Sequence, residues 1–163
     1  MQERDIAALD ALATAEDLQS RSGLEFMCDI LAGRLAGAPI WQSLNFRLEA
    51  VAPGRVSFIG QPDIGATNMM RGVHGGWFGA ILDSCMACAV MTHVPRGRIY
   101  TTLEYKINIT RALPVGTVVR AEGIVVHAGR STGVATGEVR GIDDNRLYAT
   151  GSTTCMIMSA VPG

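Results

Sequence analysis

Residues 77–91 form a run that is apolar at every position except Asp83 and Ser84. A helix that is hydrophobic around its whole circumference has to be buried on all sides. The run is shorter than the roughly 20 residues that span a bilayer, and it contains a carboxylate, so we expect a core helix and not a membrane segment. The rest of the chain therefore has to supply apolar surface around most of this helix.

A pair of glycines, Gly75 and Gly76, stands directly before this run. If the helix begins there, its first N–H groups have no partner within the helix and lie at the positive end of the helix dipole. Such a position suits an anion or a carbonyl oxygen. One stripe of the helix carries small residues and the only carboxylate: Gly76, Gly79, Ala80, Asp83 and Ala87. We expect Asp83 to project through this strip, where a second backbone or a thin substrate can approach.

The second half of the sequence predicts an antiparallel sheet. Four stretches rich in β-forming residues are separated by short turns: 100–110, 117–127, 131–140 and 147–158. In the first of them, strict alternation puts Thr102 and Glu104 on one face and Leu103 and Tyr105 on the other. Such a sheet has to curve in order to cover a helix that is apolar all round.

The first half of the sequence predicts a helix, a hairpin and a loop. An amphipathic pattern follows Ser22, the expected N-cap, and stops near Gly37 and Pro39. A β-hairpin is expected around Pro53 and Gly54, with strands at 44–50 and 55–59. Residues 61–73 show no periodicity and are expected to form a functional loop.

We therefore predict an α+β fold, in which a curved antiparallel sheet of five to six strands wraps around one long central helix and an N-terminal helix is added. The length of 163 residues fits one domain. We expect residues 1–20 to be an N-terminal helix or a mobile tail and residues 21–163 to be the domain.

Charge and composition exclude several classes of function. The net charge is −1, and the 14 cationic side chains are scattered singly, so no basic stripe for nucleic acid is present. The first residues carry charges where a signal peptide needs an apolar core, which predicts a cytoplasmic protein without membrane association.

Four cysteines, Cys28, Cys85, Cys88 and Cys155, lack the spacing of a disulfide framework and are expected to remain thiols in the core. Cys85 and Cys88 form a C-x-x-C pair, for which a redox or zinc role is the alternative. Redox pairs of this type normally open a helix, whereas this pair lies well inside an apolar one. We therefore expect no metal site here.

The spacing Asn68-x5-His74-Gly75-Gly76-x6-Asp83 resembles that of hotdog-fold acyl-CoA thioesterases of the phenylacetic acid degradation type. The resemblance extends from about Gly23 to Met158. It implies hydrolysis of an acyl- or aryl-acetyl-CoA without a cofactor, by a homodimer or a homotetramer built as a dimer of dimers. In this family the site straddles a dimer interface, with a glycine N–H from one subunit and the helix carboxylate from its partner.

The resemblance also assigns roles to individual residues. Asn68 and the Gly75 N–H would hold the thioester carbonyl, Asp83 would act as general base or as nucleophile, and Thr102 would help to orient the water. The implied substrate-binding residues are those of the helix start and of a later turn: His74, Gly76, Gly129, Arg130 and Ser131. His74 is expected to orient the loop and not to donate protons.

Each of these residues also has a structural interpretation. Asp83 can be a satisfied structural carboxylate, although burial of an unpaired charge costs several kcal/mol. Asn68 can stabilise a turn, the glycines can serve close packing, and Arg130 can be a solvated charge.

Two other functions remain open at this stage. The chain can be a non-catalytic hotdog module that binds acyl-CoA as a sensor or carrier, for which Asp83 is the discriminating residue. It can also be a hotdog hydratase or dehydratase, which needs a histidine-carboxylate pair such as His74 and Asp83.

Overall fold

The computed structural model describes residues 12–160, so most of the tail predicted for residues 1–20 lies outside the described residues. Three short helices come first, followed by a hairpin, a long helix and four strands. In chain order the elements are α2 (Ala15–Ser20), α3 (Gly23–Leu31), α4 (Pro39–Ser43), β1 (Phe46–Ala52), β2 (Arg55–Gly60), a 3-10 turn (Ile64–Ala66), α5 (Gly75–Met91), β3 (Arg98–Ile109), β4 (Val119–Ala128), β5 (Thr132–Gly141) and β6 (Leu147–Ser159).

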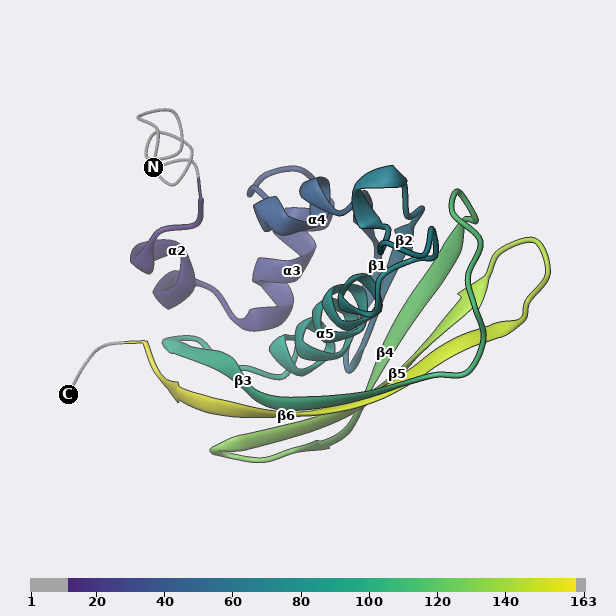
Figure 1. Cartoon of the computed structure of the whole chain (residues 1–163). Coiled ribbons are helices and arrows are strands. Elements are labelled where there is room, and N and C mark those ends of the chain that lie inside the picture. Colours follow the sequence, from purple (N-terminus) through teal and green to yellow (C-terminus); the bar gives the residue numbers. More distant parts are fainter. Residues whose placement is uncertain (1–11, 161–163) are drawn as a thin grey trace.

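The six strands form one antiparallel sheet in the order β1-β2-β4-β5-β6-β3, so β1 and β3 are its edges. The sheet curves around α5, while α3 and α4 contact the edge strand β1 and α2 contacts the edge strand β3 (Figure 1). This arrangement confirms the predicted fold, including the number of strands and the added N-terminal helix. No helix within residues 12–160 is both long and apolar enough to cross a bilayer.

A row of glycines brings α5 close to the sheet. Gly123, Gly137 and Gly151 lie opposite one another on β4, β5 and β6. A Cβ atom at Gly123 would lie 2.3 Å from the carbonyl oxygen of Cys85, and one at Gly137 would lie 2.8 Å from Cγ of Met86. Because these three positions have no side chain, the middle of α5 can lie close to the sheet backbone on the concave face.

A β-bulge in β3 corrects the predicted alternation of that strand. Thr102 pairs with Cys155 and Glu104 with the adjacent Thr154, so Leu103 is the extra residue. The bulge puts Thr102 on the face toward α5, the same face as Tyr105, and not on the face of Glu104. The prediction that Thr102 and Glu104 share a face was therefore wrong, because strict alternation takes no account of an inserted residue.

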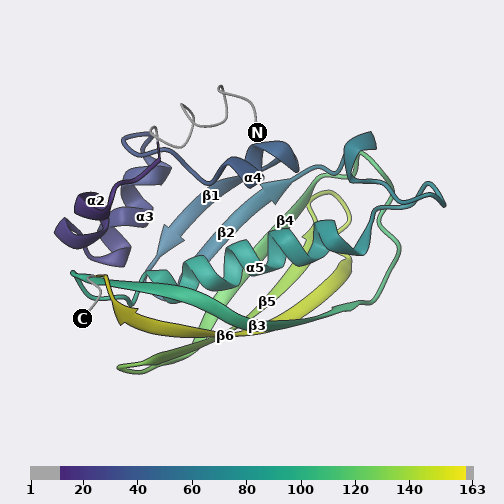
Figure 2. The same ribbon diagram turned by 60° about the vertical axis from the view of Figure 1, so that its left-hand side comes forward.

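The N-terminal helix begins as predicted but ends earlier. Ser22 is its N-cap, and its hydroxyl accepts a hydrogen bond from the Glu25 N–H while the Glu25 carboxylate accepts from the Ser22 N–H. The helix ends at Leu31, and Gly33 then adopts a φ of +73°. The short helix α4 follows where the amphipathic pattern was expected to stop. Both α2 and α3 lie beside the C-terminal end of α5 and the start of β3 (Figure 2).

Candidate active site

The carboxylate of Asp83 lies half-buried on α5 and is paired with a hydroxyl. Oδ1 of Asp83 accepts a hydrogen bond from Oγ1 of Thr102, 3.0 Å away on β3. Burial raises the pKa of Asp83 above its usual value, while the Thr102 hydrogen bond lowers it in part. Within residues 12–160, Asp83 forms no ion pair with a cationic side chain. A carboxylate in these surroundings is a stronger base than one in water.

The start of α5 offers one free N–H group. His74 is the N-cap, and its Nδ1 atom accepts a hydrogen bond of 2.9 Å from the Gly76 N–H. The Trp77 N–H is donated to the His74 carbonyl oxygen, 3.0 Å away. Among residues 12–160, these bonds leave the Gly75 N–H without a partner. Gly75 therefore provides the available donor, whereas the Gly76 N–H is already hydrogen-bonded to His74, which caps the helix.

Asn68 organises the loop that leads into α5. Its Oδ1 atom accepts hydrogen bonds from the N–H groups of Met70 and Gly72, at 2.9 and 3.1 Å. Its own N–H group is donated to the Gly72 carbonyl oxygen, 2.8 Å away. The structural interpretation of Asn68 thus has direct support. With the oxygen fixed in this way, the part of the side chain left for a ligand is the NH₂ group, which can donate to a carbonyl oxygen.

The two halves of the site are far apart within one protomer. Asp83 lies eight residues after Gly75, which corresponds to about 12 Å along the helix axis. Strand β3 follows the same stretch of helix in the opposite direction: Thr102 contacts Asp83, Tyr105 lies next to Gly79, and Ile109 lies next to Gly75. One protomer therefore does not bring Asp83 and the Gly75 N–H to a single carbonyl group.

The predicted Gly129–Ser131 turn joins β4 to β5, and Arg130 at its tip is exposed. Gly133, two residues after Ser131, pairs with Cys155, and Cys155 pairs with Thr102. The turn therefore lies at the end of the sheet near Asp83, and not at the end near Gly75. Arg130 forms no ion pair within residues 12–160, so its charge is available to an external anion.

Comparisons with known proteins relate part of this chain to one superfamily. The family model of the thioesterase superfamily matches residues 71–148, a little under half of the chain, and this range contains α5 and β3 to β5. Residues 71–148 thus match the thioesterase superfamily, and the chain has the hotdog fold. A search of curated protein sequences finds no significant match.

Solved structures of similar proteins superpose on most of this chain. A mutant of the phenylacetic acid degradation protein PaaI from Thermus thermophilus is 25% identical, with a TM-score of 0.67 over 73% of this chain and 98% of the other. A hypothetical thioesterase from Streptococcus pneumoniae, solved with coenzyme A, is 23% identical, with a TM-score of 0.64 over 71% and 87%. The protein smu.793 from Streptococcus mutans, bound to acetyl-CoA, is 22% identical, with a TM-score of 0.64 over 71% and 90%.

The thiols of Cys85 and Cys88 are buried and unreactive. Burial raises the pKa of the Cys88 thiol to about 12 and also raises the pKa of Cys85. Both thiols are therefore protonated at neutral pH, and redox exchange and metal binding both require the thiolate. The pair packs in the core around α5, as the sequence favoured.

Tyr100 is a residue of the site region that the sequence did not single out. It precedes Thr102 by two positions on β3, so both side chains point toward α5, and its hydroxyl lies beside the Cys88 thiol. Burial raises the pKa of Tyr100 well above its usual value, so the phenol is neutral. Alternation before the bulge could have placed Tyr100 beside Thr102, but only the fold shows that it meets Cys88.

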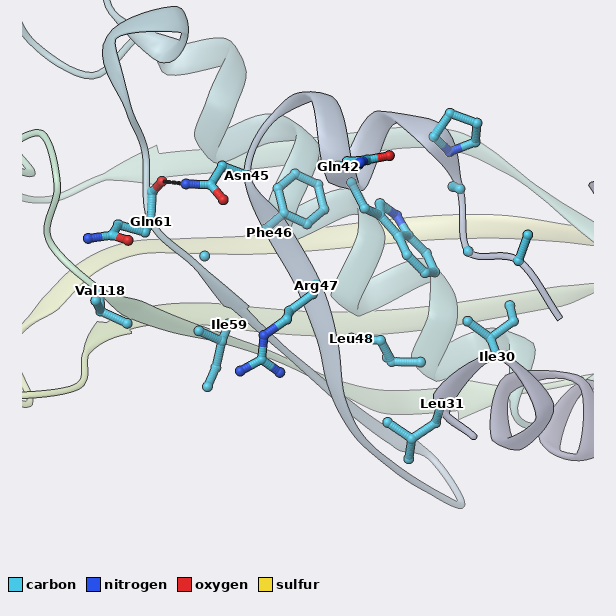
Figure 3. Close-up of a pocket in the computed structure, with 16 residues that line it drawn as sticks. Ile30, Leu31, Gln42, Asn45, Phe46, Arg47, Leu48, Ile59, Gln61 and Val118 are labelled. Carbon is cyan, nitrogen blue, oxygen red and sulfur yellow. Dashed lines mark hydrogen bonds between the residues drawn. The ribbon is translucent and has the colours of Figure 1, made fainter. Parts of the chain in front are cut away.

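Two cavities lie near the N-terminal helices, and neither contains a predicted site residue. The larger, about 750 Å³, lies between the segment from α3 to α4 and the strands β1 and β2. Figure 3 shows the Arg47 side chain within it and Leu48 and Ile30 along its wall. The smaller, about 370 Å³, reaches Cys88 on α5 and Tyr100 on β3.

We expect Asn68→Asp to separate the two functions of Asn68. Aspartate keeps the acceptor oxygen that binds the Met70 and Gly72 N–H groups, so the loop is expected to fold. It replaces the donor NH₂ by a second oxygen, and thioester hydrolysis is expected to fall by about 10²-fold, as when one donor to a developing oxyanion is lost. The measurement is kcat/KM, with the melting temperature as the control for folding. An Asn68→Asp variant with unchanged kcat/KM would limit Asn68 to its structural role.

Proposed function

We propose that this protein is an acyl-CoA thioesterase that hydrolyses an acyl- or aryl-acetyl-CoA to the free acid and coenzyme A. The observation that supports it best is the half-buried Asp83 carboxylate, which has a raised pKa and a hydroxyl partner but, within residues 12–160, no cation. Buried carboxylates without a counter-charge are costly for folding, so this one calls for a functional explanation. The coenzyme A and acetyl-CoA complexes of the two streptococcal proteins support the choice of substrate.

The site is proposed to form between two protomers. Gly79 lies midway between Gly75 and Asp83, and a Cβ atom there would be 3.1 Å from the hydroxyl oxygen of Tyr105. A two-fold axis that passes near Gly79 and is perpendicular to α5 makes the two copies of α5 antiparallel. Gly75 of the partner subunit then lies opposite Asp83. A single symmetric dimer would then contain two complete sites.

The surface of β3 is suited to such a contact. It is an edge strand, so its outer row of backbone N–H and C=O groups has no partner strand within the sheet. Its apolar side chains Leu103, Tyr105 and Ile109 are 56%, 46% and 46% exposed, although they lie on or near the strip that faces Gly79 and Gly75. Apolar side chains at an open edge favour burial against a second copy of the chain.

The proposed chemistry uses one water molecule. Asp83 accepts a proton as the water oxygen attacks the thioester carbonyl carbon, and Thr102 holds the carboxylate in place. The carbonyl oxygen gains negative charge and accepts hydrogen bonds from the Gly75 N–H and the Asn68 NH₂ group across the interface. The C–S bond then breaks, the carbonyl reforms, and the proton from Asp83 neutralises the departing thiolate. In the alternative, Asp83 attacks the carbonyl carbon itself, the C–S bond breaks and the coenzyme A thiolate leaves. Water then hydrolyses the mixed anhydride, which restores the Asp83 carboxylate and releases the acid, while the proton released from water neutralises the thiolate.

Binding of the coenzyme is proposed to involve the Gly129–Ser131 turn. Arg130 at the tip carries an exposed guanidinium group, which suits the phosphates of coenzyme A. The same acyl-CoA site without turnover would be a sensor or carrier, which is the alternative function.

A thiol-release assay over a panel of acyl-CoAs tests the proposal. We expect release of free coenzyme A from at least one of acetyl-, octanoyl-, palmitoyl- and phenylacetyl-CoA at rates well above spontaneous hydrolysis. Equilibrium binding of the same compounds is measured in parallel. Tight binding of the panel without thiol release would favour the sensor or carrier over the enzyme.

A further inference from the structure

The smaller cavity, which we call the chamber, is an open apolar pocket between two parts of the chain that are distant in sequence. One wall is formed by the N-terminal segment, including Phe26, Ile30 and Trp41, and the other by the C-terminal half of α5 and the start of β3. The lining contains no charged side chain among the described residues: it consists of Leu12, Ala13, Leu18, Phe26, Met27, Ile30, Ala36, Gly37, Ala38, Trp41, Cys88, Met91, Ile99 and Tyr100. An uncharged, apolar lining of this kind selects an apolar ligand.

One end of the chamber lies near the proposed catalytic carboxylate, close enough for the charge of Asp83 to act on two of the lining residues, Cys88 and Tyr100. Tyr100 lies two residues before Thr102 on β3, and its hydroxyl meets the thiol of Cys88 on α5, so Tyr100 connects the region of the Thr102–Asp83 pair to the chamber. Cys88 lies five residues after Asp83, which corresponds to about 7.5 Å along the helix axis. Figure 2 shows α2 and α3 beside this end of α5, so the N-terminal segment covers the side of the helix toward which the cavity extends.

We propose that this chamber receives the acyl group of the thioester, and that the protein therefore prefers acyl groups of about six carbons or more, aromatic rings included, over acetyl. This inference rests on the proposed function, because it takes the thioester carbonyl to lie at Asp83. An extended chain advances about 1.2 Å per bond, so at least about six bonds are needed to cover the axial separation of Asp83 and Cys88 alone. Acetyl is too short to reach the chamber.

The volume of the chamber agrees with an acyl group of this size. The cavity measures about 370 Å³. An apolar protein cavity of about 150 Å³ is large enough to bind benzene, so a phenyl ring or a chain of several methylenes fits here. The N-terminal wall belongs to residues 12–41, which lie outside the range 71–148 that matches the thioesterase superfamily. The acyl preference is thus assigned to a segment that is separate from the residues of the proposed chemistry.

Two substitutions in the chamber test this assignment. Cys88→Met adds two heavy atoms at the end near Tyr100, and we expect it to lower the ratio of octanoyl-CoA to acetyl-CoA kcat/KM by about tenfold, since each buried methylene is worth about fourfold. Phe26→Ala enlarges the chamber, and we expect it to raise the ratio of dodecanoyl-CoA to hexanoyl-CoA by a similar factor. Leu31→Ala is the matched control for Phe26→Ala, because Leu31 is on the same helix but lines only the larger cavity.

Ratios of two substrates on one preparation do not depend on the fraction of active protein, so partial misfolding of a variant does not obscure the result. Binding of octanoyl-CoA and acetyl-CoA is measured by calorimetry on the same proteins. Thioester hydrolysis with ratios that stay unchanged in both chamber variants would overturn the assignment and leave the enzyme proposal standing. Shifted binding ratios without turnover of any thioester would support the chamber and overturn the enzyme proposal.

Discussion

Replacement of Asp83 by asparagine is expected to abolish most thioester hydrolysis, with a loss of about 10²- to 10⁴-fold, which is the range that a general base contributes. Asparagine has nearly the same shape as aspartate. Its side-chain oxygen can take the position of Oδ1 and accept the hydrogen bond from the Thr102 hydroxyl. It has no basic oxygen for the proton of the attacking water and cannot form an anhydride. The measurement is kcat by thiol release on the acyl-CoA that the wild-type protein turns over fastest. Turnover at the wild-type rate would exclude Asp83 from the chemistry.

The pH dependence of the wild-type protein provides a second readout of Asp83. Since burial raises the pKa of this carboxylate, kcat is expected to fall on the acid side at a pH above the usual value of 3.8. The Thr102 hydroxyl lowers the pKa in part, so Thr102→Val is expected to move the acid limb to higher pH. Thr102→Ser keeps the hydroxyl and is the matched control, for which the limb is expected to stay in place.

The Asp83→Asn substitution is also expected to increase stability. Because the pKa of Asp83 is raised in the folded state, the folded protein binds a proton more tightly than the unfolded chain does. The contribution of Asp83 to stability is therefore fully present below pH 3.8 and is lost as the pH rises through the raised value. At neutral pH the ionised carboxylate opposes folding, so Asp83→Asn is expected to melt at a higher temperature than the wild type. An inactive and more stable variant is the combination that separates a catalytic carboxylate from a structural one.

The fold could be predicted from the sequence because its strongest signals are local. The all-round apolar run can only be a buried helix, and turns such as Pro53-Gly54 separate the strand patterns clearly. The N-cap of α3 could also be predicted from the sequence, since Ser22 and Glu25 have the spacing of a capping box. The family resemblance named the curved sheet, whereas the order of its strands is a finding of the structure.

The positions of individual side chains could not be predicted, because they depend on contacts between distant segments. The bulge at Leu103 places the Thr102 side chain toward Asp83. The sequence of residues 98–109 contains no pattern that predicts an inserted residue. The glycine row on β4, β5 and β6 is visible only once the register is known. The use of the Gly76 N–H by His74 is a local contact that the sequence permits but does not require.

Replacement of Gly75 by proline is expected to reduce hydrolysis by about 10²- to 10³-fold, the usual effect of losing one donor to an oxyanion. Gly75 is the first residue of α5, where proline is favoured in helices because its missing N–H would have no partner there. His74 before it has φ and ψ of −68° and 139°, which is the conformation that a residue preceding proline adopts. The nearest atom to a Cβ at this position is Cδ1 of Ile109 at 3.6 Å, so the Cβ of alanine or proline fits. Gly75→Ala adds a carbon but keeps the N–H, and it is the matched control.

Mixing the two inactive proteins is expected to restore activity if each site joins Gly75 of one protomer to Asp83 of the other. In a mixed dimer of Gly75→Pro and Asp83→Asn subunits, one site contains both substitutions and the other contains neither. Random exchange makes half of the dimers mixed, so about a quarter of the wild-type sites are restored. The measurement is thiol release after the two variants are refolded together, with each variant refolded alone as the control. If Gly75 and Asp83 acted within one protomer, every site would carry one substitution and activity would stay at the level of the separate variants.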